Sequence, residues 1–303
     1  MNKILKALLF LGVLMMLPCM VSAAKEDASV FASEEGQGML KAPGGTEEED
    51  VSGSSGESGR VSWGAPNQGT AAREIDPGKL TVAIDPGHQG DWVDMSAQEP
   101  MAPGSKQTKA KATTGTQGKF TGIPEYEVNL KVSLALREEL EARGYQVVMT
   151  REDNDTAISN KERAELATSA NADITVRIHA NGDNSSLAAG ALTMAPTSSN
   201  AYLSQDIIEK SNLLADSIIE NYCAATGLEN LGVISADNMT GTNWSTVPVA
   251  ILEMGFMSNK GDDEYITDSK NHPAMVMGIA DGIDAYFSIV QSEETEGGEA
   301  ERP

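Results

Sequence analysis

Short apolar runs that suit β-strands alternate with amphipathic helical segments over residues 80–291, and this alternation limits the possible folds most strongly. The strand-like runs are rich in β-branched residues and almost free of charge, as is typical of strands buried on both faces. A helix between two strands returns the chain so that the next strand runs in the same direction. We therefore expect an α/β fold, with a mostly parallel twisted sheet covered by helices on both faces, in a single domain.

The end signals of two helices support this division of the chain. Gly144 stops the first helix, and Ser159 followed by Glu162 forms a capping box at the start of the second. About 210 residues are enough for one full hydrophobic core. The expected strands span residues 81–84, 145–149, 173–178, 189–195 and 247–252, and the expected helices span residues 125–143, 159–171, 204–226 and 272–287.

The first 24 residues predict a signal peptide. Lys3 and Lys6 precede an apolar run over residues 7–17, and Val21, Ser22 and Ala23 are small residues at the cleavage positions. The apolar run is shorter than the roughly 20 residues of a spanning helix. We expect no other segment to span a bilayer, so the mature protein should be secreted or extracytoplasmic, with no stable membrane span after cleavage.

The two ends of the mature chain are acidic and poor in apolar residues. Residues 25–78 predict a disordered acidic linker rich in Gly and Ser, and residues 292–303 predict a disordered acidic tail. The formal net charge is −23, and nine acidic residues face three basic ones in residues 25–60. Nucleic-acid binding needs clustered Lys and Arg, so the charge balance argues against a nucleic-acid partner. The folded domain is expected over residues 79–291.

Reactive side chains stand at the ends of three expected strands. His88 follows the first strand and the turn Asp85-Pro86-Gly87, His179 ends the third strand, and Glu253 ends the last one. The carboxyl ends of parallel strands lie on one edge of a sheet, so these side chains can converge there. Glu125, which opens a helix, can lean toward the same edge. Each residue also has an ordinary structural reading, since a lone His often caps a turn and acids favour a first helical turn.

Two histidines and one glutamate, with a second glutamate left free, are the make-up of a catalytic zinc site. Three protein ligands leave a fourth position for water, and a nearby carboxylate can take the proton of that water. The chain has no short HExxH helix, so the spacing alone is weak evidence for zinc.

The motifs around these residues also resemble a known family, the zinc-dependent N-acetylmuramoyl-L-alanine amidases of the type called amidase 3. The resemblance covers residues 80–287 and includes the helix that bears Arg163. The matching motifs, in the order of the family, are DPGHQG at 85–90, EYEVNL at 125–130, TRED at 150–153, RIHAN at 177–181 and ILEMGFMSN at 251–259.

The resemblance implies a peptidoglycan hydrolase that cuts the amide between N-acetylmuramic acid and the L-alanine of the stem peptide. It implies Zn²⁺ as the cofactor, with His88, Glu125 and His179 as ligands. Glu253 matches the catalytic glutamate of the family, which activates the water. Glu127 is the residue most easily mistaken for the ligand Glu125. Whether a protein activator is needed stays open.

The chain departs from the family pattern in two places. The interval from His88 to Glu125 is 37 residues, longer than in shorter members, and its polar insertion over residues 105–122 carries four lysines. This insertion is either a solvated loop or a flap that grips substrate. Arg177 stands where a small residue often precedes the Ile-His-Ala-Asn motif. If its side chain points inward, it could bind a carboxylate of the stem peptide.

Two other functions fit the same residues. One is a zinc peptidase that acts on other peptides, and the other is a catalytically inactive wall-binding domain of the same fold. An inactive domain would have lost a ligand or the base, and all four positions are filled here.

Overall fold

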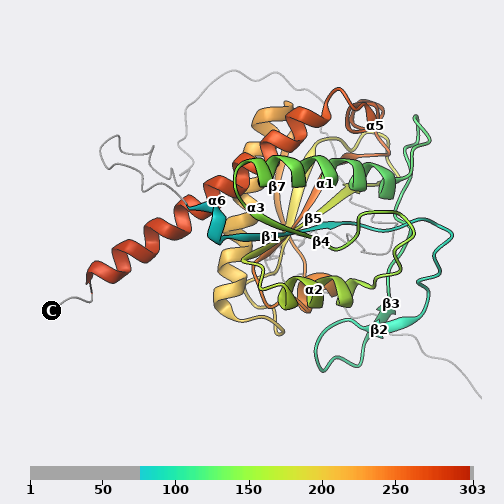
Figure 1. The fold of residues 1–303 in the computed structure, drawn as a ribbon. Coiled ribbons are helices and arrows are strands. Elements are labelled where there is room, and N and C mark those ends of the chain that lie inside the picture. The colour runs from blue at the N-terminus through green and yellow to red at the C-terminus, as the bar shows by residue number, and fades with distance from the viewer. Residues whose placement is uncertain (1–75, 301–303) are drawn as a thin grey trace, which may run out of the picture.

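A computed structural model describes residues 76–300 of the 303-residue chain (Figure 1). The expected signal peptide and nearly all of the expected linker lie outside these residues. The described part of the chain includes residues 76–78, which were expected to belong to the linker. Pro77–Lys79 form a 3-10 turn, η1, and Gln146 Nε2 donates a hydrogen bond to the carbonyl of Gly78.

Six strands form one sheet in the order β4-β1-β5-β8-β6-β7. The first four of these strands are parallel to their neighbours, β6 is antiparallel to β8, and β7 is parallel to β6. The prediction of a mostly parallel sheet is therefore confirmed. The strands are β1 (Thr81–Pro86), β4 (Gln146–Met149), β5 (Ile174–Asn181), β6 (Ala191–Ala195), β7 (Asn230–Ser235) and β8 (Val249–Phe256).

Helices cover both faces of this sheet, as predicted (Figure 1). Three long helices, α1 (Glu125–Ala142), α3 (Gln205–Thr226) and α6 (His272–Ala300), pack on the face that carries Val82 and Ile84 and bury the main core. The opposite face carries Ala83, which packs against Ala167 of α2 (Asn160–Ser169). The short helices α4 (Thr240–Asn243) and α5 (Lys260–Thr267) flank β8 in the chain. Alternation along β1 thus assigns each residue to one layer.

The strands that lead to the site run further than expected. β1 includes Asp85 and Pro86, and β5 and β8 continue past His179 and Glu253, so these two residues lie within strands and not at their ends. Pro86 is tolerated because β4 pairs with β1 only as far as Ile84. The missing N–H of Pro86 therefore faces a side of β1 where no neighbouring strand would accept a hydrogen bond.

Several short elements have no expected counterpart. β7 is an edge strand whose residues are exposed or half-buried, and it contains Gly232 at a φ of 78°. Without an apolar alternation, its sequence gives no strand signal. The long interval after His88 contains a two-stranded hairpin, β2 (Gln98–Pro100) and β3 (Thr108–Ala110).

The last helix corrects two expectations. It was expected to end at residue 287 and to be followed by a disordered tail from residue 292, but α6 continues to Ala300. Glu and Ala are good helix formers, and no proline interrupts the chain before Pro303. Residues 272–293 also have the length and composition of a membrane span, which was expected of no segment beyond the leader. Half of that stretch is buried in the domain, where Met275, Ile279 and Ile283 join the core.

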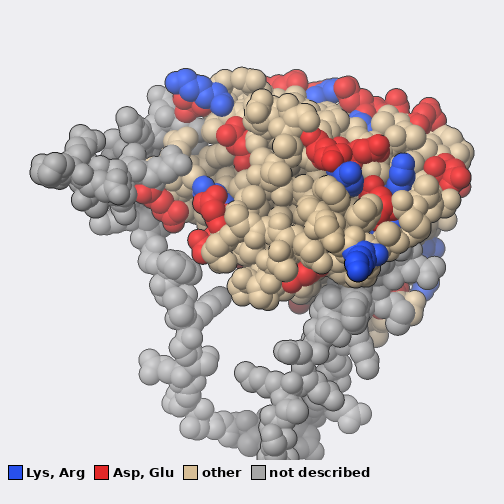
Figure 2. Space-filling model, turned by 90° about the horizontal axis from the view of Figure 1, so that it is seen from below, with Lys and Arg blue, Asp and Glu red and all other residues tan. Residues whose placement is uncertain are grey.

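Charged side chains of both signs are spread over the surface. Figure 2 shows the face that carries α2, where Lys and Arg lie singly or in small groups among Asp and Glu. This face therefore presents no broad field of one sign.

Candidate metal centre

The three predicted ligands meet at one buried point. His88 Nε2 lies 3.1 Å from Glu125 Oε1, and His179 Nδ1 lies 3.1 Å from His88 Nε2 and 3.3 Å from Glu125 Oε1. All three residues are buried, although they come from the end of β1, the start of α1 and the middle of β5. The structure thus brings together residues that are up to 91 positions apart in the chain.

The backbone and outer contacts of His88 fix the direction of its ring. Its φ of 63° lies in the left-handed region, which costs roughly 1–3 kcal/mol for a residue with a side chain. Nδ1 of His88 lies 2.9 Å from the carbonyl oxygen of Thr113. Because a carbonyl only accepts, Nδ1 carries the proton and Nε2 is left with a free lone pair toward the other two ligands.

Glu125 is held by hydrogen bonds to both of its oxygens. Oε1 accepts from the Asn129 side chain and from the backbone N–H of Ala180, each at 3.1 Å, and Oε2 accepts from the N–H of Thr116 at 2.8 Å. By contrast, Glu127 is partly exposed and pairs with Lys131 at 3.2 Å, on the solvent side of the same helix. The geometry therefore separates Glu125 from its neighbour, as the motif implied.

Two glycines make room for the ligand rings. A Cβ on Gly87 would lie 2.2 Å from Cε1 of His179. A Cβ on Gly115 would lie 2.5 Å from Oε2 of Glu125 and 2.7 Å from Cδ2 of His88, and Gly115 has a φ of 78°. Any larger residue at either position would push the ligands apart, so both glycines are part of the site.

The donor set fits zinc. Nitrogen and oxygen ligands bind zinc at about 2.0–2.2 Å, and tetrahedral geometry then separates the donors by about 3.3–3.5 Å, close to the spacing found here. Nε2 of His179 and Oε2 of Glu253 are buried and have no hydrogen-bond partner among the described residues. Buried polar atoms are rarely left unpaired, so such atoms beside the donor triangle indicate a site that takes up a further group.

The charges of the ligands already favour a cation. Burial alone would raise the pKa of Glu125, but His88 and His179 outweigh that effect and hold the pKa of this carboxyl well below its usual range. Burial also lowers the pKa of His179, which keeps its ring neutral although its hydrogen bond to the Glu125 carboxylate acts in the opposite direction. An ionised carboxylate and a neutral imidazole are the forms that bind metals.

Glu253 stands beside this triangle without joining it. It is the register partner of His179 on the adjacent parallel strand, so the two side chains leave the sheet on the same face. Glu253 is buried, and burial together with the nearby Glu125 raises the pKa of Glu253 well above its ordinary value, with Arg177 acting in the opposite direction. A buried carboxyl with a raised pKa and a free oxygen suits a proton acceptor.

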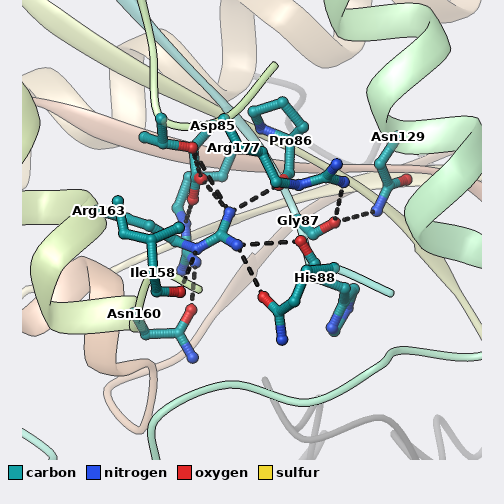
Figure 3. A network of polar contacts seen from close by, with 12 residues as sticks. Asp85, Pro86, Gly87, His88, Asn129, Ile158, Asn160, Arg163 and Arg177 are labelled. Carbon is teal, nitrogen blue, oxygen red and sulfur yellow. Dashed lines mark hydrogen bonds and ion pairs between the residues drawn. The ribbon is translucent and has the colours of Figure 1, made fainter. Parts of the chain in front are cut away.

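A buried carboxylate braces the loop that carries His88. Arg163 and Arg177 reach Asp85 from two sides, at 2.6 Å and 2.7 Å (Figure 3). Burial would raise the pKa of Asp85, but these two guanidiniums hold it far below its ordinary value. Arg163 Nη2 also donates to the carbonyl of His88 at 3.0 Å, and Arg151 Nη2 donates to the carbonyl of Gly87 at 2.9 Å. The TRED motif and the Arg163 helix therefore act on the first ligand through the backbone.

Comparison with known proteins identifies the family. Residues 82–285 match the Amidase_3 family model, described as N-acetylmuramoyl-L-alanine amidase. The chain belongs to this family.

Two relatives and one solved structure show how far the similarity extends. The N-acetylmuramoyl-L-alanine amidase LytC of Bacillus subtilis is 31% identical over 166 residues, which are 55% of this chain and 32% of LytC. The probable cell wall amidase LytH of Staphylococcus saprophyticus is 28% identical over 208 residues, 69% of this chain and 58% of LytH. The chain thus spans less than two thirds of either relative. The catalytic domain of CwlV from Bacillus (Paenibacillus) polymyxa is 28% identical with a TM-score of 0.55, covering 69% of this chain and 98% of that domain.

Arg177, one of the two departures from the amidase 3 pattern, has a structural place. Its side chain lies on the same face of β5 as His179, but it is 2% exposed and is bound to Asp85 and to the Asn160 side chain. A Cβ on Gly241 would lie 2.5 Å from its guanidinium. The guanidinium is therefore enclosed by the protein, and the idea that it meets a carboxylate of the substrate is wrong.

The insertion is the other departure, and it is ordered around the metal centre. Glu99 of the hairpin accepts a hydrogen bond from the N–H of Lys161 at the start of α2, and the carbonyl of Pro100 accepts from Trp244 Nε1. The returning segment then supplies Thr113 to His88 and Thr116 to Glu125. Residues 113–116 of the insertion therefore lie against the ligands, whereas residues 106–108 and 119–120 are exposed, so only part of the segment forms a wall of the site.

Sequence reasoning did not assign roles to these supporting residues. Thr116 acts through its backbone N–H, whereas Thr113 contacts His88 Nδ1 through both its carbonyl oxygen and its hydroxyl, at 2.9 Å and 3.2 Å. Asn129 was visible only as part of the EYEVNL motif, and its amide bonds both Glu125 and the carbonyl of Gly87. Gly115 could have been noticed as a glycine inside a Thr-rich stretch, although nothing in the sequence places it against two ligands.

Proposed function

We propose that this chain is a secreted peptidoglycan hydrolase that cleaves the amide between N-acetylmuramic acid and the L-alanine of the stem peptide. The observation that carries the proposal is the buried triangle of His88, Glu125 and His179 with the unpaired carboxylate oxygen of Glu253 beside it. Membership of the Amidase_3 family supports this choice of bond.

We propose His88, Glu125 and His179 as the ligands of one Zn²⁺ ion. When bound, zinc acts as a Lewis acid that polarises the amide carbonyl and makes water a stronger nucleophile. The hydrogen bond that His88 donates to the carbonyl of Thr113 and the one that Glu125 accepts from Asn129 hold the ligands in place before the ion binds. Outer contacts of this kind commonly raise metal affinity 10- to 100-fold.

Glu253 supplies the proton transfers in this mechanism. Its carboxylate accepts the proton of the attacking water and passes it to the nitrogen of the departing L-alanine, which leaves as an amine. Its strand position opposite His179 holds the carboxylate without any hydrogen bond that would compete for Oε2.

The two alternatives are less well supported. An inactive wall-binding domain has no need for a buried carboxyl whose oxygen is left unpaired beside a complete donor set. A zinc peptidase shares the chemistry, but the relatives are named as amidases of N-acetylmuramoyl-L-alanine or of the cell wall.

Export to the cell wall completes the proposal. The first 24 residues, which resemble a signal peptide, and the cell wall amidase relatives both support action outside the cytoplasm. Peptidoglycan is the partner we propose.

Digestion of intact sacculi tests the function. The zinc-loaded chain, without its first 24 residues, should release stem peptides whose new N-terminus is L-alanine and leave glycan strands with free lactyl carboxyl groups. Mass spectrometry of the products identifies the bond. Cleavage within the peptide, or equal turnover of free peptides that lack the lactyl group, would contradict an amidase.

Gly115→Ala should weaken zinc binding by about 10- to 100-fold, because the new methyl group meets Glu125 and His88. Gly104→Ala is the matched control. Gly104 has a φ of 75°, so placing Ala there strains the backbone about as much as at Gly115. No atom lies within 4 Å of the added Cβ at Gly104. Competition with a chelating dye measures both affinities. Equal zinc affinity in the two variants would show that Gly115 has only a backbone role.

A further inference from the structure

A groove of about 430 Å³ opens beside the metal centre. Gln89 follows the ligand His88 in the chain, and the carbonyl of Thr113 accepts the hydrogen bond of the His88 ring, so the groove and the metal centre share a wall. Backbone hydrogen bonds from Lys111 to Ala97 and from Ala112 to Met95 join its two sides. We call it the Trp92 groove, and its lining includes Gln89, Asp91, Trp92, Asp94 and Thr113.

Trp92 is held rigidly although most of it is exposed to water. Its side chain is 61% exposed, its Nε1 donates to Oδ1 of Asp155 at 2.6 Å, and its ring meets Tyr126 edge to face at 6.0 Å. A Cβ on Gly90 would lie 2.4 Å from the indole, so the backbone there also packs against the ring. The ring is already fixed before a ligand binds, so binding a ligand on it costs little further side-chain entropy.

The groove offers the chemical groups that bind a sugar. Because the indole N–H is already bonded to Asp155, the exposed part of Trp92 offers aromatic carbon atoms for contact. A pyranose presents C–H groups on its faces, which pack on an aromatic ring, and hydroxyl groups on its edge, which donate to carboxylates. Asp91 and Asp94 are exposed and line the groove beside Trp92.

The negative charge of the groove favours one of the two parts of the substrate, the glycan arm or the peptide arm. The amide that is cut joins a glycan strand to a stem peptide that carries carboxylates. Two aspartates in the groove repel carboxylates at short range, whereas they accept hydrogen bonds from neutral hydroxyl groups. The glycan arm therefore fits the groove better than the peptide arm.

We propose that the Trp92 groove binds a sugar ring of the glycan strand next to the scissile amide, with the ring packed on Trp92 and its hydroxyl groups bonded to Asp91 and Asp94. This inference rests on the proposed function and adds the part of the substrate that this side of the site recognises. The groove adjoins His88, so a sugar bound there lies within reach of an amide at the metal centre.

The test compares two substrates that share the lactyl amide and the peptide. One is a disaccharide-peptide, and the other is a lactoyl-peptide without sugars. Trp92→Ala should raise KM for the disaccharide-peptide about 3- to 10-fold, in line with the loss of one aromatic contact. It should leave kcat for that substrate, and kcat/KM for the lactoyl-peptide, within about twofold of the wild type.

Two further variants complete the test. Asp91→Ala should also raise KM for the disaccharide-peptide alone, about 2- to 5-fold, as expected for one hydrogen bond. Since Asp91 is exposed, this variant decides the matter if Trp92→Ala does not fold. Phe120→Ala is the control, because Phe120 is a 47% exposed aromatic residue that does not line the groove. Phe120→Ala should leave the kinetics of both substrates unchanged.

Three results would overturn the inference. Unchanged kinetics in both groove variants would show that the groove binds no part of the substrate. An equal loss on both substrates would assign the groove to the peptide arm or to the fold. A wild-type protein that cleaves neither substrate would overturn the proposed function as well, so the two failures are distinguishable.

Discussion

Glu253→Gln should leave the domain folded and able to bind zinc, yet lower kcat by about 10²–10⁴-fold, the usual contribution of a general base. Gln has the shape of Glu but cannot accept a proton. The backbone of β8 around Glu253 is fixed by its pairing with β5 and β6, and Leu252 and Met254 on either side are fully buried. The substitution therefore changes the chemistry of one side chain without moving the strand.

The stability of the metal-free protein gives a second readout for the same variant. Burial and Glu125 raise the pKa of Glu253 in the folded state, so the folded protein holds this proton more tightly than the unfolded chain does. Wild-type stability should therefore fall relative to the Gln variant as the pH rises above 4.5, the ordinary pKa of a Glu side chain. Thermal melts of both metal-free proteins measure the difference in Tm.

Zinc content and turnover on muramyl peptides then decide the role of Glu253. If Glu253→Gln binds one zinc per chain, melts near the wild-type temperature and turns over very slowly, the result supports Glu253 as the general base. Loss of zinc in Glu253→Gln would instead make Glu253 a ligand, and unchanged turnover would remove it from the mechanism.

The sequence was sufficient for the parts of the fold that depend on periodicity. Buried strands such as Thr81–Pro86 are apolar on both faces, and α1 and α3 have clear helical spacing and end signals. The order of those elements gives a mostly parallel sheet, and its carboxyl edge brings His88, His179 and Glu253 together. His88 and His179 stand out because the chain has only three histidines, whereas the roles of Glu125 and Glu253 were implied by the resemblance to the amidase 3 motifs.

The other parts of the fold and site depend on contacts that produce no periodic pattern in the sequence. In the hairpin β2–β3, Glu99 and Pro100 accept hydrogen bonds from the distant residues Lys161 and Trp244. The edge strand β7 pairs with β6, and its Val233 and Ile234 pack against the core. Arg177 reads as a surface or substrate-binding cation until Asp85 is seen beside it. Such residues are defined by a partner far along the chain, so only the three-dimensional structure identifies their roles.

His88→Ala should abolish both zinc binding and turnover. The substitution removes Nε2 from a set of three donors and also the ring that Thr113 orients. With Glu125 and His179 alone, the ion keeps two protein ligands, one fewer than catalytic zinc sites use. We expect the zinc affinity to fall by well over the 10- to 100-fold that is typical of losing an outer contact.

Glu127→Ala is the matched control for the ligand set. Glu127 lies two residues after Glu125 in the same first helical turn, and its carboxylate pairs with Lys131 at the surface. Its loss should cost about 0.3–0.5 kcal/mol of stability and no zinc, because an exposed i,i+4 ion pair contributes little. Glu125→Ala should lose zinc as His88→Ala does. Chelator competition on the three variants measures the affinities, and full zinc occupancy in His88→Ala, or zinc loss in Glu127→Ala, would refute the ligand set. Because Glu125 and Glu127 share a helix terminus and differ in direction, this comparison separates metal ligation from the general preference of helix starts for acids.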